Sequence, residues 1–311
     1  MEGNINFYDR LAGTPAFGYR VLKSMFDYYL ASYLILDNWY DAMLIRGGMN
    51  GKTKLRFRKG NISKTISGSL VRSLVKFDYE RSSGRNIVLR YRNRPLIFHC
   101  TSDYQLTNTI TGIKEQFVED QYKDVDVNGR TVLDIGASIG DSAVYFALNG
   151  ARRVIALEPY PYTCRIAKEN ARLNRLGKKI TVLNQACREK AGTLLIDENF
   201  QNNDRNSLKY FKNGKSISMT TLAILAKKYN LKDAVLKVDC EGYEYEIIES
   251  ASTELLRKFK TIVMEYHYGS RSLEAKLTKA GFKVRSSIPF YVRKIDEKVD
   301  VLCGFLYAER I

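Results

Sequence analysis

Short apolar runs alternate with helical stretches along the C-terminal two thirds of the chain. Each run is four to nine residues long and is bounded by polar or turn-forming residues, as expected of strands buried in a sheet. Strands that alternate with helices predict an α/β fold, in which a mainly parallel sheet is covered by helices on both faces. The expected strands lie at residues 131–135, 153–157, 180–184, 234–238, 261–265, 282–285 and 299–307.

A different pattern precedes this region. Between residues 52 and 100, basic and apolar residues alternate with a period of two, which is typical of strands. Ser82, Ser83 and Gly84 form a turn signal between the runs 70–79 and 86–99, so we expect an antiparallel hairpin or small sheet with a basic face over residues 51–105. The alternating basic residues are Lys52, Lys54, Arg56, Arg58, Arg90, Arg92 and Arg94.

The first 50 residues are rich in aromatic side chains and read as one or two helices. Apolar residues fall on nearly every face of these helices, and a helix that is apolar all round needs to be covered. We therefore expect this segment to pack against the rest of the protein or against a second subunit, so that a homo-oligomer could form through it. The aromatic residues are Phe17, Tyr19, Phe26, Tyr28, Tyr29, Tyr33, Trp39 and Tyr40.

Composition changes this picture in one respect. With 311 residues, 45% of them hydrophobic, the chain can bury a large core, which excludes disorder as its main state. Its 50 Lys and Arg against 34 Asp and Glu give a net charge of +16, which suggests an anionic partner or surface. Residues 51–100 alone hold 13 basic and 2 acidic residues, so the excess charge belongs mainly to the predicted basic sheet.

The cysteines and the N-terminus favour a cytoplasmic protein. The five cysteines are an odd number and no two have the C-x-x-C spacing of zinc or redox sites, which fits a reducing compartment. The N-terminus lacks the order of a secretion signal. The most apolar stretch, residues 26–36, is interrupted by Asp27, so we expect no transmembrane helix.

A glycine-rich turn joins the first strand of the α/β region to a helix at residues 142–148. Gly136 lets the chain turn sharply, and Gly140 lets the helix start approach closely. The G-x-x-x-G spacing lacks both the three glycines of dinucleotide-binding folds and the Lys-Ser/Thr of phosphate loops. Eighteen residues after Gly140, the next strand ends at Glu158, whose carboxylate would accept hydrogen bonds from ribose hydroxyls at the carboxyl edge of the sheet.

These motifs resemble those of a known family. Residues 132–159 resemble motif I and the following acidic motif of class I methyltransferases that use S-adenosylmethionine (SAM). Residues 236–244, LKVDCEGYE, resemble the K-x-D-x-E-G-x-E signature of the FkbM-type methyltransferases. Residues 101–103, 218–222 and 263–267 are also similar to that family's pattern, whereas residues 1–50 are not covered.

The resemblance implies a Rossmann-like sheet of seven strands with one antiparallel strand near its end, preceded here by the helical and β-hairpin extension. Residues 106–311 would form the methyltransferase domain, with SAM as cofactor and S-adenosylhomocysteine as product. Glu158 would bind the ribose, and Gln185 and Ala186 would lie near the adenine. The full set of expected cofactor-binding residues is Asp134, Gly136, Ala137, Ser138, Gly140, Asp141, Glu158, Pro159, Gln185 and Ala186.

Four residues near the ends of two later strands are candidates for catalysis. Asp239 follows the strand that adjoins the first one in this sheet order and is expected nearest the sulfonium and the acceptor. Glu241 either shares that role or caps the helix beginning near Gly242. His267 could accept a hydroxyl proton, with Glu265 two residues earlier as its orienting group, although a loop histidine is also often only a hydrogen-bonding residue.

Methyl transfer to an oxygen needs no metal, and we predict none. Magnesium held by the same four residues, Asp239, Glu241, Glu265 and His267, is the alternative, since carboxylates suit that ion. His99, inside an apolar run of the basic hairpin, is expected to be structural.

The function that these observations favour is methyl transfer from SAM to a hydroxyl of a sugar, glycolipid or small metabolite, and an anionic acceptor would suit the net charge. One alternative is an RNA methyltransferase that binds nucleic acid through residues 51–100. It is less favoured because the basic residues interleave with Leu and Val more than with stacking aromatics. A non-catalytic SAM-fold binding protein is the third alternative.

Overall fold

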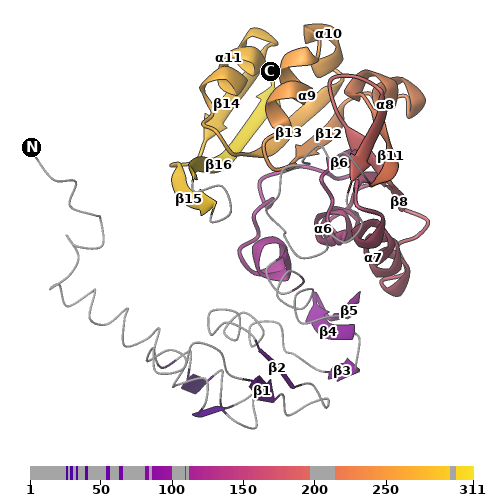
Figure 1. Cartoon of the computed structure of the whole chain (residues 1–311), viewed down its shortest axis with the longest axis vertical. Helices are drawn as coiled ribbons and strands as arrows, with labels where there is room; N and C mark the ends of the chain where they lie inside the picture. The colour runs from indigo at the N-terminus through magenta and orange to yellow at the C-terminus, as the bar shows by residue number, and fades with distance from the viewer. Residues whose placement is uncertain are drawn as a thin grey trace, which may run out of the picture. The chain divides into compact units, whose positions relative to one another are not determined.

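A computed structural model of the chain describes residues 86–99, 112–196, 214–294 and 299–311. It also describes the stretches 54–56, 63–65 and 81–83 and the single residues 26, 29, 30, 33, 39, 40 and 109. The chain forms two compact units, Met1–Val118 and Glu119–Ile311 (Figure 1). The limits expected for the N-terminal segments, at residues 50 and 105, stay predictions.

The N-terminal unit contains two small antiparallel sheets. One pairs β1 (Lys54–Arg56) with β2 (Ser63–Thr65), and the other joins β3 (Arg81–Ser83), β4 (Asn86–Tyr91) and β5 (Arg94–His99) in that order. The predicted antiparallel character is confirmed at these residues, and π-helix η1 (Lys114–Val118) ends the unit.

Two details of the predicted hairpin were wrong. Residues 86–99 form two strands, because Arg92 and Asn93 have positive φ angles of 46° and 62° and turn the chain between β4 and β5. Arg92 therefore lies in a turn and does not continue the alternation of Arg90 and Arg94. Ser82 lies within β3, as does Ser83. The run 70–79 lies outside the described residues.

Two further expectations concern side chains of this unit. His99 Nδ1 lies 3.0 Å from Asn86 Oδ1 on the paired strand, which agrees with a structural role. The described residues of the first 50 are helical, and Phe26, Tyr33 and Tyr40 are exposed in the single chain. A second subunit covering these rings stays a prediction.

The C-terminal unit is built on a sheet in which seven strands follow the order β14-β16-β13-β12-β6-β7-β8. Strand β16 is antiparallel to both of its neighbours, and the central pairs are parallel. The expected class I methyltransferase sheet is thus confirmed, and β15 (Phe290–Lys294) pairs with the beginning of β16. The seven strands are β6 (Thr131–Ile135), β7 (Arg153–Leu157), β8 (Ile180–Leu183), β12 (Ala234–Val238), β13 (Phe259–Tyr266), β14 (Phe282–Ser286) and β16 (Val299–Arg310).

Successive residues of strand β12, at the centre of this sheet, point to opposite faces and are all buried, so both faces have to be covered, and helices cover them. Leu133, Ile135, Leu236 and Val238 pack with apolar residues of α8 (Leu222–Lys228), α9 (Glu244–Ser250), α10 (Thr253–Leu256) and α11 (Arg271–Lys279) in one continuous core. Helices α6 (Asp141–Leu148) and α7 (Pro161–Leu173) pack on each other and beside β7 and β8 (Figure 1).

A separate small sheet follows β8. It has the order β10-β11-β9 and consists of β9 (Gln185–Cys187), β10 (Gly192–Ile196) and β11 (Lys215–Thr220). Its core is formed by Ala186, Leu194, Ile196 and Ile217. Periodicity did not predict this sheet. Within the part of the chain that the structure describes, no helix has the length and apolar character needed to cross a membrane.

Candidate active site

The glycine-rich turn places three left-handed residues at alternate positions after β6. Gly136, Ser138 and Gly140 have φ angles of 76°, 46° and 82°. The N–H groups of Gly136 and Ala137 donate to the carbonyl of Leu157 at the end of β7, with N–O distances of 3.1 and 2.9 Å. The turn is thus tied to the carboxyl edge of the neighbouring strand, and Gly140 caps α6, whose first residue, Asp141, is buried.

A buried lysine, Lys237, organises this edge. Its Nζ donates to the carbonyl of Gly136 at 2.7 Å and lies 3.2 Å from Asp134 Oδ1 and 3.6 Å from Asp239 Oδ2. Ser142 Oγ donates to the second oxygen of Asp134 at 2.7 Å. Burial would lower the pKa of Lys237, but the charges of Asp134 and Asp239 outweigh it and hold that pKa well above its usual value.

Glu158 is buried at the end of β7 and holds the two adjoining loops. Its carboxylate accepts hydrogen bonds from the N–H of Ser138 at 3.0 Å and of Tyr160 at 2.9 Å. Burial nevertheless raises the pKa of Glu158 to about 8. Asn184 donates to the carbonyls of Glu158 and Pro159, which fixes both residues beside β8.

The residues expected near the adenine lie in β9. Gln185 donates through Nε2 to the hydroxyl of Ser218 at 3.1 Å, and Ala186 is buried in the core of the small sheet. Tyr160, which follows the acidic motif, packs against the same core. The adenine contact of Gln185 and Ala186 stays a prediction.

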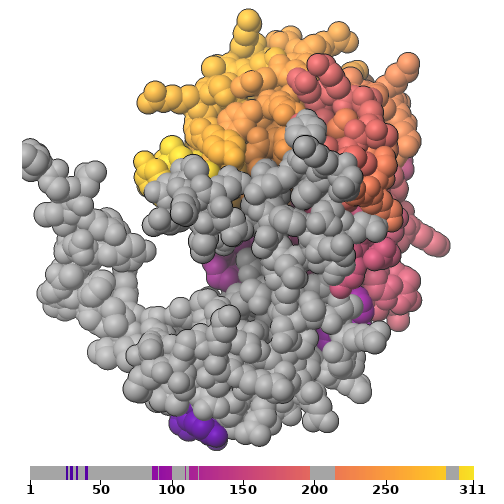
Figure 2. Space-filling view, in the orientation of Figure 1, coloured from indigo at the N-terminus to yellow at the C-terminus, as the bar shows by residue number. Residues whose placement is uncertain are grey.

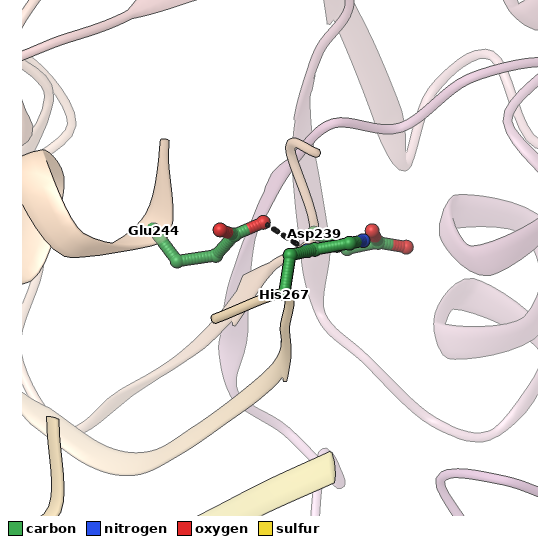
Figure 3. Close-up of side chains that lie close together, drawn as sticks. All are labelled: Asp239, Glu244 and His267. Atoms are coloured by element: carbon green, nitrogen blue, oxygen red, sulfur yellow. Dashed lines mark hydrogen bonds and ion pairs between the residues drawn. The ribbon is translucent and has the colours of Figure 1, made fainter. Parts of the chain in front are cut away.

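His267, just past β13, is held by a carboxylate that the sequence did not single out. Its Nδ1 lies 3.1 Å from Oε1 of Glu244, the buried first residue of α9 (Figure 3). The same oxygen accepts the N–H groups of Cys240 and Gly242 at 2.9 and 3.2 Å. Burial would raise the pKa of Glu244, but the bond to His267 lowers it, so the carboxylate is ionised and Nδ1 donates.

The other ring nitrogen of His267 faces the loop after β12. Nε2 lies 3.5 Å from Glu241 Oε2, and Figure 3 shows the Asp239 carboxylate at this end of the ring. Burial would lower the pKa of His267, but the bond and charge of Glu244, together with Glu241, raise it to about 9.

One sequence expectation needs correction here. The carboxylate that orients His267 is Glu244 and not Glu265, which lies two residues earlier in β13. The capping role of Glu241 stays a prediction; this residue has a left-handed φ of 56°, and its Oε2 lies 3.5 Å from His267 Nε2. The signal for Glu244 and Lys237 was present, because both lie within the 236–244 signature.

Asp239, Glu244 and His267 have ligand atoms within 4.8 Å of one another, so a metal ion has to be considered. The imidazole ring, however, lies between the two carboxylates, with Glu244 at one end and Asp239 at the other (Figure 3). Three ligands of one ion would instead have to converge on a common point. At one end of the ring Nδ1 is hydrogen-bonded to Glu244, and at the other Nε2 lies 3.5 Å from Glu241.

Carboxylates outnumber cations at this edge of the sheet. This edge carries two cations, Lys237 and His267, and a larger number of acidic side chains. Burial disfavours the charged form of such side chains; at Asp141, for example, burial raises the pKa to about 6. Such an edge suits a cationic ligand that also donates hydrogen bonds. The acidic side chains are those of Asp134, Asp141, Glu158, Asp239, Glu241 and Glu244, of which Glu158, with its pKa of about 8, is largely uncharged at pH 7.

Comparison with known proteins agrees with the sequence motifs. The family model described as the methyltransferase FkbM domain matches residues 134–284. The chain is 42% identical over 55 residues to ribosomal protein L11 methyltransferase of Carboxydothermus hydrogenoformans, a match that covers 18% of each chain. Of two curated relatives, the chain spans only 18% and 26% of their own lengths.

Solved structures similar to this chain include two methyltransferases. Precorrin-6y C5,15-methyltransferase of Geobacter metallireducens has a TM-score of 0.38 and 15% identity, over 63% of this chain and 88% of its own. A SAM-dependent methyltransferase of Agrobacterium tumefaciens has a TM-score of 0.39 and 13% identity, over 74% of this chain and 71% of its own.

Proposed function

Since residues 134–284 are a methyltransferase FkbM domain, whose cofactor is SAM, we propose that the protein transfers a methyl group from SAM to a hydroxyl. The acceptor is a sugar, a glycolipid or a small metabolite. The observation that supports oxygen as the methyl-accepting atom is the hydrogen-bonded pair of Glu244 and His267 beside Asp239. This pair supplies a base for the hydroxyl proton.

The residues present fit this cofactor. SAM supplies a sulfonium-bound methyl group that is already electrophilic, and it carries two positive charges when its amino group is protonated. The carboxylates of Asp134 and Asp239 sit on either side of Lys237 at the carboxyl edge and complement such charges. Each oxygen of Glu158 accepts one backbone N–H and retains a lone pair for a ribose hydroxyl. The turn from Gly136 to Asp141, with Pro159, Gln185 and Ala186, completes the proposed cofactor-binding set.

The proposed chemistry divides between two groups of this chain. Asp239 orients the acceptor hydroxyl and opposes the positive charge of the reacting centre. His267 accepts the hydroxyl proton through Nε2, while Glu244 fixes the ring and its tautomer through Nδ1, as the carboxylate does in a Ser-His-Asp triad. A base within hydrogen-bond reach is worth about 10² to 10⁴ in rate. Glu241 contributes a second acceptor beside Nε2.

The acidic edge also bears on the alternatives. Phosphodiester groups would meet the carboxylates of Asp239 and Glu241 at the proposed acceptor position, which disfavours RNA. A non-catalytic binding protein would not require Glu244 to be bonded by two backbone N–H groups and a histidine at once.

Two measurements test the function. SAM at 100 times its Kd should stabilise the full chain by about 2.7 kcal/mol in a thermal-shift assay. Labelled methyl groups from SAM should enter a glycan, lipid or metabolite fraction; labelling confined to RNA would contradict the proposal.

A variant tests the role of Asp239. Asp239→Asn should retain most SAM binding and lose most turnover, whereas Glu254→Gln, an exposed carboxylate on α10, should behave as the parent. Equal loss of binding and turnover in Asp239→Asn would assign Asp239 to the cofactor.

A further inference from the structure

Three residues on neighbouring stretches of chain, Tyr268, Leu302 and Tyr291, are paired side by side in the C-terminal sheet. Leu302 of β16 pairs with Tyr291 of β15 on one side and forms a bridge with Tyr268 on the other. Residues paired across neighbouring strands present their side chains on the same face, about 5 Å apart at each step. Tyr268, Leu302 and Tyr291 therefore form a strip, called here the tyrosine strip, about 10 Å long.

The tyrosine strip reaches the surface. The exposed fractions are 55% for Tyr268 and 78% for Tyr291, which is high for rings held in a sheet. Figure 2 shows that atoms of the C-terminal end of the chain, in yellow, lie at the surface of the C-terminal unit. Exposed aromatic rings in a row are a common form of binding surface.

One end of the tyrosine strip is part of the proposed active site. Tyr268 follows His267 directly, and a β-carbon on Gly242 would lie 2.7 Å from Cε2 of the Tyr268 ring. The ring therefore rests on the loop that carries Asp239 and Glu241. Its backbone is fixed, because Tyr268 N–H donates to the Tyr245 hydroxyl at 2.8 Å and Gly269 N–H donates to the Leu302 carbonyl at 3.0 Å.

We propose that the tyrosine strip is the acceptor subsite and that it binds the apolar face of a saccharide ring. This inference rests on the proposed function, since it takes the methylated hydroxyl to be that of a sugar. A pyranose presents C–H groups on its faces and hydroxyls around its edge. The faces match the rings of Tyr268 and Tyr291, and the edge hydroxyls can donate to the carboxylates of Asp239 and Glu241, which are acceptors only.

The charges beside the tyrosine strip distinguish a sugar from a nucleic acid. Single-stranded nucleic acids also stack on aromatic rings, but their binding surfaces combine such rings with cations that follow the phosphates. Here the Tyr268 end of the strip lies against Gly242, the residue after Glu241, and follows His267, whose Nε2 lies 3.5 Å from the Glu241 carboxylate. A neutral hydroxylated ring meets no repulsion at that point.

The test uses the full chain and a panel of methyl glycosides of glucose, galactose, mannose, rhamnose and N-acetylglucosamine. Saturation-transfer NMR with irradiation of aromatic protons should show transfer to the sugar C–H protons of at least one glycoside. Tyr268→Ala and Tyr291→Ala should each weaken this binding, and raise KM for the same acceptor, by about three- to tenfold, the scale of one aromatic contact. Tyr→Phe at either position should change both by less than twofold, because the ring is kept.

Ile224→Ala on α8, also an exposed apolar side chain, is the matched control and should change nothing. Affinity for S-adenosylhomocysteine should stay the same in every variant; a loss in the tyrosine variants would assign the strip to the cofactor and overturn the inference. So would the absence of glycoside binding, an unchanged KM, or binding of an oligoribonucleotide or of phosphatidylcholine vesicles that the Ala variants abolish instead. If glycosides bind through the tyrosines but no acceptor is methylated, the proposed function fails while the subsite stands.

Discussion

Gly136 lies directly against the carbonyl of Asp239: a β-carbon on Gly136 would stand 1.7 Å from the Asp239 carbonyl oxygen. The two residues follow β6 and β12, whose last residues, Ile135 and Val238, are paired, and Asp239 N–H donates to the Ile135 carbonyl at 3.0 Å. The glycine therefore does more than allow a turn. It lets the two strand ends that carry the proposed site close against each other.

Gly136→Ala should consequently be far more damaging than an alanine at another left-handed glycine. Gly129 is a matched control, because its φ of 66° is close to the 76° of Gly136 but its β-carbon would have nothing within 4 Å. In both variants alanine has to adopt a left-handed backbone conformation, which destabilises the fold by about 1 to 2 kcal/mol. Gly136→Ala adds a clash with backbone, about 1 to 3 kcal/mol or more. Urea unfolding of both variants measures the difference, and equal losses would contradict the close contact.

Lys237→Met should destabilise the protein by about 3 to 5 kcal/mol, because it leaves a buried carboxylate without its cation. Asp134 is fully buried and has Lys237 Nζ at 3.2 Å, so its charge would remain uncompensated. Urea unfolding at pH 7 gives the free energy of unfolding.

The double variant Lys237→Met with Asp134→Asn separates charge from packing. It removes both charges and keeps similar side-chain volumes, so it should recover part of the stability lost in Lys237→Met. If the loss of unfolding free energy in the double variant equals the sum of the losses in the two single variants, Lys237 acts through its bond to Gly136 and not through Asp134.

Periodicity predicted the large sheet well, because its strands are short, apolar and buried on both faces. The predicted ranges 131–135, 153–157 and 234–238 coincide with β6, β7 and β12. Parallel strands share a carboxyl edge, so periodicity predicted that Asp134, Glu158 and Asp239 follow or end strands at one edge of the sheet. That the strand before Asp239 adjoins the first strand was implied by the family resemblance and not by strand composition or chain order; the pairing of β12 with β6 agrees with it.

The run 86–99, predicted as one strand, is divided in two for a local reason. A turn lies at Arg92 and Asn93, where two non-glycine residues adopt a left-handed conformation, and a basic residue in an alternating pattern gives no sign of this. The turn signal that ends at Gly84 did mark a junction, because β3 ends at Ser83, which pairs with Asn86 at the start of β4.

The partner of His267 could not be found from strand alternation. The spacing of Glu265 and His267 suggested a common side, but His267 lies beyond β13, where the period of two no longer applies. The partner is Glu244, which reaches it because the left-handed residues Glu241 and Gly242 turn the loop back before α9. Strand periodicity does not encode such closure, although Glu244 itself lies within the 236–244 signature.

His267 should titrate near pH 9 in the free protein, well above an ordinary histidine. The chain has only two histidines, so its imidazole C–H signals in NMR reduce to those of His267 and His99, and His99→Gln assigns them. Because a general base must be neutral, methyl transfer should rise with pH up to about 9. A signal for His267 that titrates at pH 6.5 or below would contradict the charge network around the ring.

The same raised pKa predicts how stability depends on pH. A histidine whose folded pKa exceeds its unfolded one stabilises the protein fully below the unfolded value, about 6.5, and this stabilisation is lost as pH rises through the folded value, about 9. The difference in urea midpoint between the parent and His267→Gln should therefore shrink between pH 6.5 and pH 9. A difference that is constant over this range would show that the imidazolium charge does not stabilise the fold.

Glu244→Gln should move the titration of His267 to lower pH by about 1 to 3 units, because it removes the closest negative charge while keeping a side-chain oxygen for Nδ1. The pH at which methyl transfer reaches half its maximum should fall with it, so the variant would be less dependent on alkaline conditions than the parent. Glu249→Gln, an exposed carboxylate on the same helix, is the control and should leave both values unchanged. A rate profile that stays in place while the NMR titration moves would separate His267 from the proton transfer and leave Asp239 or Glu241 as the acceptor of the proton.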